Sequence, residues 1–335
     1  MVLCGGSSCA ADKVSDEEVS MRNRVFVIVF VVMLVVPQSG FGQTTGAAGL
    51  QRMPDGRPDL QGAWSFATIT PLERPSEYSG REFLTDEEVA SLNEDAATRA
   101  SSGRREELSA QRDVDLAYDQ FWWDRGTSDG RTSLIVDPAD GRIPFTVEGR
   151  DRIDLRRSLR DRPARGPEDR SPGERCVHHT KAGPPMSSGG YNNHLRLLQT
   201  SDYVVIYTEQ IHDARIIPMD GRAKLTVKIE QWMGSSRGHW NGDTLVVETR
   251  NFNGKASFQG SSTGLILIER FTRRDADTLT YEYTLEDPEI YERAWTAALD
   301  LKPLDGDMYE FACHEGNYGM TNLLAGARVE ERAGR

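Results

Sequence analysis

The strongest constraint on the fold is an alternation of apolar and polar residues in the C-terminal half of the chain. In the segment 278–286 every second residue is apolar, namely Leu279, Tyr281, Tyr283 and Leu285. A period of two is that of a β-strand with one buried and one exposed face. From about Tyr191 to Asn322 the sequence therefore predicts short antiparallel strands.

Turn residues separate these strands. Asn241-Gly242 suits a type I′ turn and predicts a hairpin. Further turns are expected at Asp275–Asp277 and Asp305-Gly306. The strands that these turns would join are 231–240 with 243–251, 265–273 with 278–286, and 295–301 with 308–313. Before them, one long strand is expected from Tyr203 to Ile217.

Strands at this spacing, without helices between them, predict a mainly β fold. Gly62-Ala63-Trp64 resembles the entry to the first strand of lipocalin-type barrels. We therefore expect an antiparallel lipocalin-like barrel or sandwich. Asp-Gly-Arg recurs at Asp55, Asp129, Asp140 and Asp220, which indicates repeated turn chemistry and not a structural repeat.

A charged helical and loop insertion is expected at residues 83–175. Thr85 to Glu88 form a capping box, which predicts a helix from Asp86 to about Gln111. The segment 149–175 holds nine arginines interspersed with Asp and Glu. A solvated face of paired charges is the favoured interpretation, and a basic arm that binds anions is the alternative. Residues 43–82 would supply the first strand and 176–335 the antiparallel β region, with 43–335 forming one domain.

The N-terminus has the pattern of a secretory signal peptide. Arg22 and Arg24 precede an unbroken apolar run at 25–36, and small residues follow it. We expect residues 1–42, an upstream extension and the signal peptide, to be removed. A signal anchor with a cytoplasmic tail is the alternative. The product would be periplasmic or secreted.

The net charge of −12 at pH 7 argues against nucleic acid as a partner. After the signal peptide no apolar stretch approaches the length of a membrane span, so no membrane insertion is expected. A small molecule remains as the expected partner. The oligomeric state is left open.

Two of the four cysteines, Cys176 and Cys313, lie beyond the signal peptide. In an oxidising compartment they would form a disulfide that closes a long loop. Two buried free thiols are the alternative.

Dispersed polar residues on the expected strands suggest a lined pocket. His212-Asp213 and His314-Glu315 combine imidazole and carboxylate groups and are the candidate catalytic residues, because such pairs shuttle protons near neutral pH. Arginines suit an anionic group. The candidate ligand-binding residues are Arg215, Arg237, His239, Asn192, Asn193, Asn317 and Tyr318.

Other motifs in the sequence give weaker indications of function. Two Gly-x-Ser-x-Gly segments, 234–238 and 260–264, fall in a predicted hairpin and a loop, and not at the strand-to-helix turn that a nucleophilic serine needs. In the segment that begins at His314, Tyr318 stands where a zinc protease helix has its second histidine. Neither a metal nor another cofactor is predicted. The alternative is a metal held by histidines from several strands, namely His178, His194, His212, His239 and His314.

Five segments together resemble a large family of exported, uncharacterised bacterial proteins. They are residues 58–64, 211–217, 232–240, 242–247 and 313–318. The resemblance implies export and supplies neither an activity nor a catalytic residue.

The leading hypothesis is an exported β protein whose pocket binds a small organic ligand, anionic if Arg215 and Arg237 face it. The first alternative is a metal-independent acid–base enzyme, such as an isomerase, lyase or hydrolase, that uses the His/carboxylate pairs. The second alternative is a surface interaction protein without a pocket.

Overall fold

The computed structural model describes residues 50–100, 123–160, 162–179, 181–226, 229–255 and 258–334. All of them belong to one compact unit, Thr44–Arg335. The predicted signal peptide and the last part of the helix expected to reach Gln111 lie outside these residues. Among the described residues, no helix combines the length and the apolar character that a membrane crossing requires.

The fold is mainly β and antiparallel, as predicted. Nine strands form one continuous path in the order β5-β4-β3-β1-β10-β9-β8-β7-β6, and a tenth, β2, pairs with β10. The strands are β1 (Gly62–Ser65), β2 (Ile135–Asp137), β3 (His194–Gln199), β4 (Tyr203–Thr208), β5 (Ala214–Pro218), β6 (Ser235–Asn241), β7 (Thr244–Arg250), β8 (Ile266–Arg273), β9 (Leu279–Glu286) and β10 (Trp295–Pro303).

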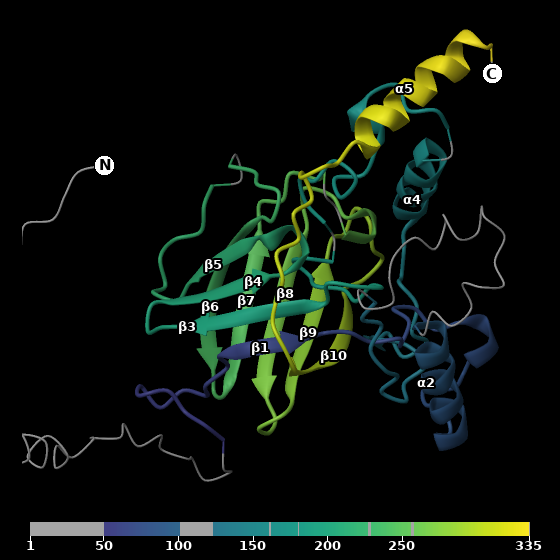
Figure 1. The fold of residues 1–335 in the computed structure, drawn as a ribbon. Helices are drawn as coiled ribbons and strands as arrows, with labels where there is room; N and C mark the ends of the chain where they lie inside the picture. The colour runs from purple at the N-terminus through teal and green to yellow at the C-terminus, as the bar shows by residue number, and fades with distance from the viewer. Residues whose placement is uncertain are drawn as a thin grey trace, which may run out of the picture. The chain divides into compact units, whose positions relative to one another are not determined.

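The sheet folds over so that its two parts face each other across the core. In Figure 1, β3 and β4 cross the strands β7 to β9 at a steep angle. Buried residues of both parts, such as Leu195 and Ile206 on one side and Leu267 and Tyr283 on the other, belong to one hydrophobic cluster. Burial of this apolar surface is the main force that holds the two parts together.

The sheet is not a closed barrel, so the barrel alternative of the prediction is wrong. Its end strands, β5 and β6, lie side by side, but they share no ladder of hydrogen bonds. Pro218 at the end of β5 has no amide hydrogen to donate. The side chain of Met219 occupies the space beside Gly238, where the sulfur would be 2.3 Å from an added Cβ. These two features leave the seam between β5 and β6 unpaired.

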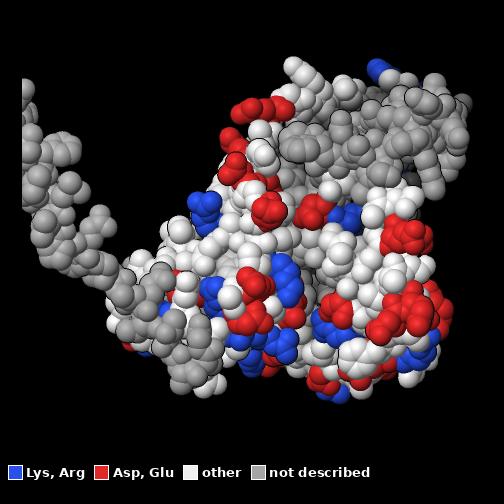
Figure 2. Space-filling view, turned by 60° about the horizontal axis from the view of Figure 1, so that its bottom comes forward, with Lys and Arg blue, Asp and Glu red and all other residues white. Residues whose placement is uncertain are grey.

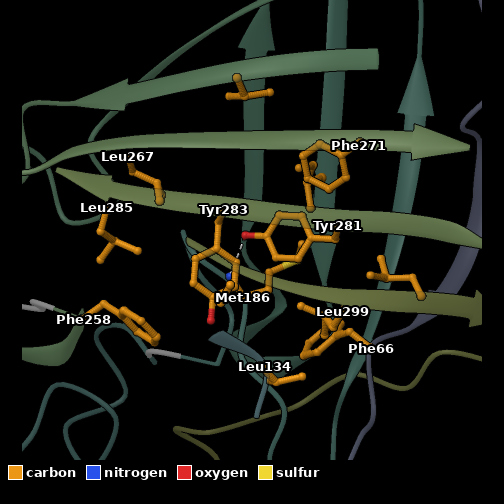
Figure 3. Packing of buried hydrophobic residues seen from close by; sticks show 14 of the residues in the cluster. Phe66, Leu134, Met186, Phe258, Leu267, Phe271, Tyr281, Tyr283, Leu285 and Leu299 are labelled. Carbon is orange, nitrogen blue, oxygen red and sulfur yellow. Dashed lines mark hydrogen bonds between the residues drawn. The ribbon is translucent and has the colours of Figure 1, made fainter. Parts of the chain in front are cut away.

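The alternation predicted for β9 is confirmed. Its residues are buried and partly exposed in turn, with Tyr281 and Tyr283 facing the core (Figure 3). The next strand, β10, has the same pattern and buries Trp295 completely. Phe258 stacks on Trp295 and meets Tyr283 edge to face, with ring centroids 6.4 and 6.1 Å apart. Aromatic side chains therefore fill the centre of the core.

The long strand expected from Tyr203 to Ile217 is instead a hairpin, so that prediction is wrong. β4 ends at Thr208, a short 3₁₀ helix η5 (Gln210–His212) follows, and β5 returns antiparallel to β4. Ile211 and His212 have positive φ angles of 66° and 48°. That conformation is rare for a β-branched residue, which explains why the sequence carries no turn signal here.

The hairpins β6–β7 and β8–β9 are present as expected. In the first, Asn241 pairs with Thr244, so the two loop residues are Gly242 and Asp243, one position later than predicted. Gly242 has φ 58°, which a side chain would strain. Residues 308–313 form no strand, and the prediction there is wrong.

Three α-helices lie in the described residues: α2 (Asp86–Ala100), α4 (Val147–Arg160) and α5 (Gly319–Arg332). The predicted capping box opens α2, because the amide of Glu88 donates to Thr85 Oγ1 at 3.3 Å and the amide of Thr85 donates to Glu88 Oε2 at 2.8 Å. The C-terminal helix α5 was not predicted. Short 3₁₀ helices η1 (Ser76–Tyr78), η4 (Pro167–Asp169) and η6 (Phe258–Gly260) complete the elements of the described part of the chain.

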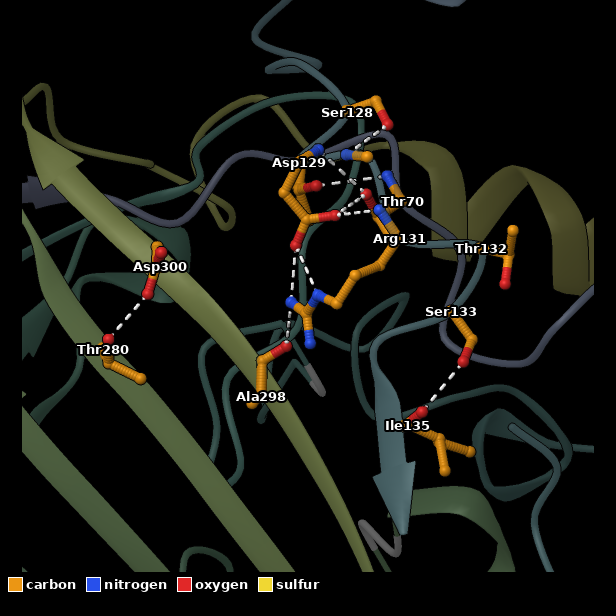
Figure 4. Close-up of polar contacts among 12 residues, drawn as sticks. Thr70, Ser128, Asp129, Arg131, Thr132, Ser133, Ile135, Thr280, Ala298 and Asp300 are labelled. Carbon is orange, nitrogen blue, oxygen red and sulfur yellow. Dashed lines mark hydrogen bonds and ion pairs between the residues drawn. The ribbon is translucent and has the colours of Figure 1, made fainter. Parts of the chain in front are cut away.

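All four Asp-Gly-Arg segments are the turns that the sequence predicts. In each, the Asp side chain accepts a hydrogen bond of 3.0 or 3.1 Å from the Arg amide two residues later, and the central glycine has positive φ. In Figure 4 the guanidinium of Arg131 reaches β10 and donates to Ala298 O at 2.7 Å. This bond ties the segment before β2 to the main sheet.

A disulfide joins Cys176 and Cys313, which are 137 residues apart. It links the loop before β3 to the segment before α5. At the surface, acidic and basic groups are interspersed over the face that Figure 2 shows, and neither sign dominates it. This mixture is consistent with the many exposed Arg–carboxylate pairs, such as Arg274–Asp300 and Arg293–Asp137.

Candidate functional site

A pocket of about 830 Å³ lies between α4, the segment 168–175 and η6. We call it the main pocket. Its volume falls in the range of small-molecule sites, about 300–1,000 Å³. Its lining residues are Ile153, Arg156, Arg157, Leu159, Glu168, Asp169, Arg170, Ser171, Pro172, Arg175, Ser187, Trp232, Lys255, Phe258, Gln259 and Gly260.

Two glycines allow α4 to pack closely on its neighbours, the connection between β9 and β10 and the helix η6. A Cβ on Gly149 would lie 2.3 Å from Ile290 O, and one on Gly260 would lie 3.2 Å from Ile153 Cδ1. Gln259, between Phe258 and Gly260, has φ 47°, and its carbonyl accepts a 3.1 Å hydrogen bond from Tyr291 Oη. A residue held in this strained region is more common at binding sites than elsewhere.

The main pocket is basic and partly apolar. It contains five basic and two acidic side chains, and Trp232 and Phe258 add aromatic surface. Both acids are engaged: Asp169 pairs with Arg162 at 3.2 Å and Glu168 lies 3.8 Å from Arg175. Three of the five basic groups also pair with carboxylates: Arg157 with Asp154 at 3.0 Å, Arg170 with Glu174 at 2.6 Å and Arg175 with Glu168. The positive excess beside the apolar wall therefore comes from Arg156 and Lys255.

Two of the basic groups, Arg156 and Lys255, differ from the others in their surroundings. Burial lowers the pKa of Arg156, and the neighbouring charge of Arg152 lowers it further, while one of its nitrogens donates to Gly254 O at 3.3 Å. Among the described residues, no side chain forms a hydrogen bond or ion pair with the ammonium group of Lys255. A positively charged group in such a place is stabilised by an anion that enters the pocket.

A second, more open hollow of about 610 Å³ lies at the unpaired seam between β5 and β6. We call it the edge pocket. Arg215 and Arg237, two of the predicted ligand-binding residues, line it, and Trp232 borders both pockets. Trp232 is therefore a lining residue that the two hollows share.

Both terminal nitrogens of Arg215 already have a hydrogen-bond partner in the core. Its two terminal nitrogens donate to Glu269 Oε2 and Oε1 at 2.6 and 3.0 Å, and Tyr281 Oη donates to Glu269 Oε1 at 2.8 Å. Burial, and then the charge of Glu269, raise the pKa of Tyr281 well above its ordinary value. A further bond from Met186 N to Tyr281 Oη, 3.1 Å long (Figure 3), completes the network. The core therefore contains one hydrogen-bonded network of Arg215, Glu269, Tyr281 and the Met186 amide.

Arg237 and His239 share one face of β6, as their spacing predicts, but it is the outer face, since Ser236 and Gly238 are the buried residues of this part of the strand. The guanidinium of Arg237 donates to Ser236 O and Ala223 O at 2.7 and 3.0 Å. His239 is exposed. Of the pair, only Arg237 borders a pocket.

None of the four predicted catalytic residues lines the main or the edge pocket. His212 is exposed at the end of η5, and its Nδ1 lies 3.0 Å from Phe311 O. Burial raises the pKa of Asp213, against the opposing effect of His212. His314 and Glu315 are exposed in the turn before α5. The chain thus brings His212 to the segment that precedes His314, but on the surface.

The remaining predicted residues have other roles. Asn193 is fully buried, and its side chain contacts Gly189 and the carbonyl of Asp124. Asn192 is partly buried, with φ 54°. Asn317 donates to Cys176 Sγ at 3.2 Å, and Tyr318 is 73 % exposed. None of these three asparagines lines either pocket, and Tyr318 does not either.

Sequence reasoning missed a cluster of ionisable groups around His194. Nδ1 of His194 lies 2.6 Å from Glu209 Oε2, and Nε2 lies 2.9 Å from Asp124 Oδ2. Burial opposes the charge on this imidazole, but the bonds to Asp124 and Glu209 outweigh it and raise the pKa of His194 to about 9. Glu209 also accepts from Tyr309 N at 3.0 Å. At neutral pH His194 is therefore a cation held between two carboxylates.

The register of the β3–β4 hairpin would have revealed half of this cluster. Leu195 pairs with Thr208, so the next residues, His194 and Glu209, lie opposite each other. Asp124 arrives from another segment and has no local signal. The described residues contain no group of three or more His, Cys, Asp and Glu side chains suited to hold a metal ion.

The two Gly-x-Ser-x-Gly segments are structural. Ser236 is buried on β6 and bonds to Thr249, with 2.9 Å between the hydroxyl oxygens. Ser262 is buried, and its hydroxyl donates to Asp287 at 3.0 Å. Neither hydroxyl is presented as a nucleophile.

Comparison of the chain with protein-family models, with curated proteins and with solved structures finds no match.

Proposed function

We propose that this protein binds a small amphipathic organic anion in the main pocket. The observation that supports the proposal is the pocket itself, about 830 Å³ in volume, with five basic side chains against two acidic ones and an aromatic wall. An apolar body would lie against Trp232 and Phe258. Its anionic group would meet Arg156, Arg157 or Lys255.

The proposal moves the expected site away from the residues that the sequence suggested. The charge of Arg215 is already balanced by the buried carboxylate of Glu269, so we do not assign the anionic group of the ligand to it. The edge pocket is then a second hollow that shares Trp232 with the main pocket and is not the proposed site. The analogy with lipocalin-type proteins is limited, in this proposal, to the holding of a small molecule in an exported β protein.

Two aromatic probes of nearly the same shape test the role of charge. The anion 8-anilinonaphthalene-1-sulfonate and its uncharged analogue N-phenyl-1-naphthylamine share one ring system and differ in the sulfonate. We expect the anion to bind at least about 10-fold more tightly, since a charge-assisted contact contributes on the order of 1.5 kcal/mol. Higher ionic strength should narrow the difference. Fluorescence titration of both probes measures it.

Variants test whether the sulfonate binds in the main pocket or elsewhere on the surface. Lys255→Gln and Arg157→Gln should each weaken the binding of the sulfonate several-fold and leave the uncharged probe unchanged. Arg274→Gln is the matched control, because Arg274 is an exposed arginine that lines neither pocket. Equal affinity for the two probes, or equal effects of the pocket and control variants, would exclude the proposed function.

The acid–base enzyme that relies on His212, Asp213, His314 and Glu315 has less support, because these residues line neither pocket. We therefore do not retain it as a second proposal.

A further inference from the structure

One wall of the main pocket is a segment with little regular structure. Six of the lining residues, from Glu168 to Arg175, belong to residues 162–176, which we call the wall segment. Apart from the short helix η4, this described stretch forms no helix or strand. Most of its described polar contacts stay within it, such as the pair Arg170–Glu174. The position of this wall therefore depends on what the segment is attached to.

The wall segment is attached to the C-terminal end of the chain. At its end, Cys176 forms the disulfide with Cys313. Near its start, Arg328 of α5 donates to the carbonyl oxygens of Ala164 and the next residue at 2.6 and 2.9 Å. Cys313 and α5 both belong to residues 304–332, the C-terminal segment, which runs from the end of β10 through α5 (Figure 1). One covalent bond and two hydrogen bonds thus join the wall segment to the C-terminal segment.

The C-terminal segment itself buries little surface. The amide of Leu304 donates to Ala63 O at 3.0 Å, and the amide of Tyr309 donates to Glu209 Oε1 at 3.0 Å. All residues of the segment are described, and Ala327 is the one among them that is buried. Burial of apolar surface therefore contributes little to holding this segment in place. The disulfide is correspondingly important for keeping the two segments together.

We propose that the Cys176–Cys313 disulfide is a redox switch for the main pocket. In the oxidised state the disulfide fixes the wall segment, and the pocket binds its anion. A dithiol reductant opens the disulfide, the wall segment loses its covalent attachment, and the affinity for the anion falls. This inference rests on the proposed function, because it concerns the regulation of the same pocket.

Thiol–disulfide exchange opens the bond. A thiolate of the dithiol attacks Sγ of Cys313, which is a partly exposed residue, whereas Cys176 is only 6 % exposed. The S–S bond breaks and Cys176 leaves as a thiolate, which can accept from Asn317 Nδ2, a donor 3.2 Å from this sulfur. The second thiolate of the reductant then displaces Cys313. Two electrons and two protons pass to the cysteines, and the reductant becomes a cyclic disulfide.

Fluorescence titration of the full chain with 8-anilinonaphthalene-1-sulfonate, before and after treatment with dithiothreitol, tests the switch. If the wall holds its position in about one tenth of the reduced molecules, the apparent Kd rises about 10-fold, and we expect a loss of at least this size. The uncharged N-phenyl-1-naphthylamine should weaken as much, because the wall encloses the pocket irrespective of charge. The variant Cys176→Ser with Cys313→Ser should have the low affinity without reductant. It should not respond to reductant, which excludes Cys4 and Cys9 as the cause.

A variant that leaves the disulfide intact tests the same coupling if circular dichroism shows that reduction unfolds the chain. Arg328→Ala removes the hydrogen bonds from α5 to the wall segment and should weaken both probes several-fold. Arg332→Ala, on the same helix, is the matched control and should leave both affinities unchanged, because no described residue forms a hydrogen bond or ion pair with the guanidinium of Arg332.

The outcomes separate this inference from the proposed function. Equal affinity for the sulfonate before and after reduction of a chain that stays folded, or equal effects of Arg328→Ala and Arg332→Ala, would overturn the inference and leave the proposed function standing. An oxidised chain that binds the two probes with equal affinity would exclude the proposed function, and this inference with it.

Discussion

The buried pair Arg215–Glu269 gives the sharpest stability prediction. Glu269 is 0 % and Arg215 9 % exposed, and two hydrogen bonds join them at 2.6 and 3.0 Å. Replacing Arg215 by Met keeps the apolar volume but leaves the carboxylate buried without its cation. Removal of one partner of a buried pair typically costs about 3–5 kcal/mol of unfolding free energy. We expect Arg215→Met to lose an amount in this range.

Urea unfolding followed by circular dichroism measures the loss. The double variant Arg215→Met with Glu269→Leu should lose less than Arg215→Met alone, because no uncompensated charge then remains. Arg274→Met is the control: its exposed pair with Asp300 should contribute less than about 1 kcal/mol. A loss below about 1 kcal/mol for Arg215→Met, or a double variant less stable than the single one, would refute this reasoning.

Three further predictions follow from the geometry. The folded-state pKa of His194, about 9, lies above its ordinary 6.5, so its stabilising effect is full below pH 6.5 and is lost as pH rises through 9. Unfolding free energy should fall by about 1–3 kcal/mol over this window. If the unfolding free energy of His194→Gln depends on pH as strongly as that of the unchanged protein, the raised pKa of His194 is not the cause. Reduction of the Cys176–Cys313 disulfide should cost about 2–5 kcal/mol, because it opens a long loop, and identical urea midpoints with and without dithiothreitol would speak against it. Gly149→Ala should cost about 1–3 kcal/mol, since its Cβ would lie 2.3 Å from Ile290 O, whereas Gly326→Ala, with open space around it, should not destabilise the chain.

Local sequence signals predicted the local structure well. The alternation in β9, the capping box of α2 and the four Asp-Gly-Arg turns depend on residues within about ten positions of one another, and each is present. The reversal between β4 and β5 was missed because Ile211 and His212 adopt positive φ angles without a glycine or an asparagine. There the packing of the sheet overrides local preference.

The candidate site was harder to predict because distant segments form it. Arg156 comes from α4, Trp232 from the segment before β6, and Phe258 from η6. The arginine-rich segment 149–175 was interpreted as a face of paired charges, and pairs such as Arg170–Glu174 are indeed present. What the sequence does not reveal is that Arg156 and Arg157 also line the pocket that α4 forms with η6.

A crystal structure of the protein with 8-anilinonaphthalene-1-sulfonate would show directly whether the main pocket binds an amphipathic anion. We expect the rings to lie against Trp232 and Phe258. The sulfonate should lie within about 4 Å, the limit for an ion pair, of a guanidinium nitrogen of Arg156 or Arg157 or of Lys255 Nζ. A probe bound only outside the main pocket, or one whose sulfonate points to solvent away from these groups, would contradict it.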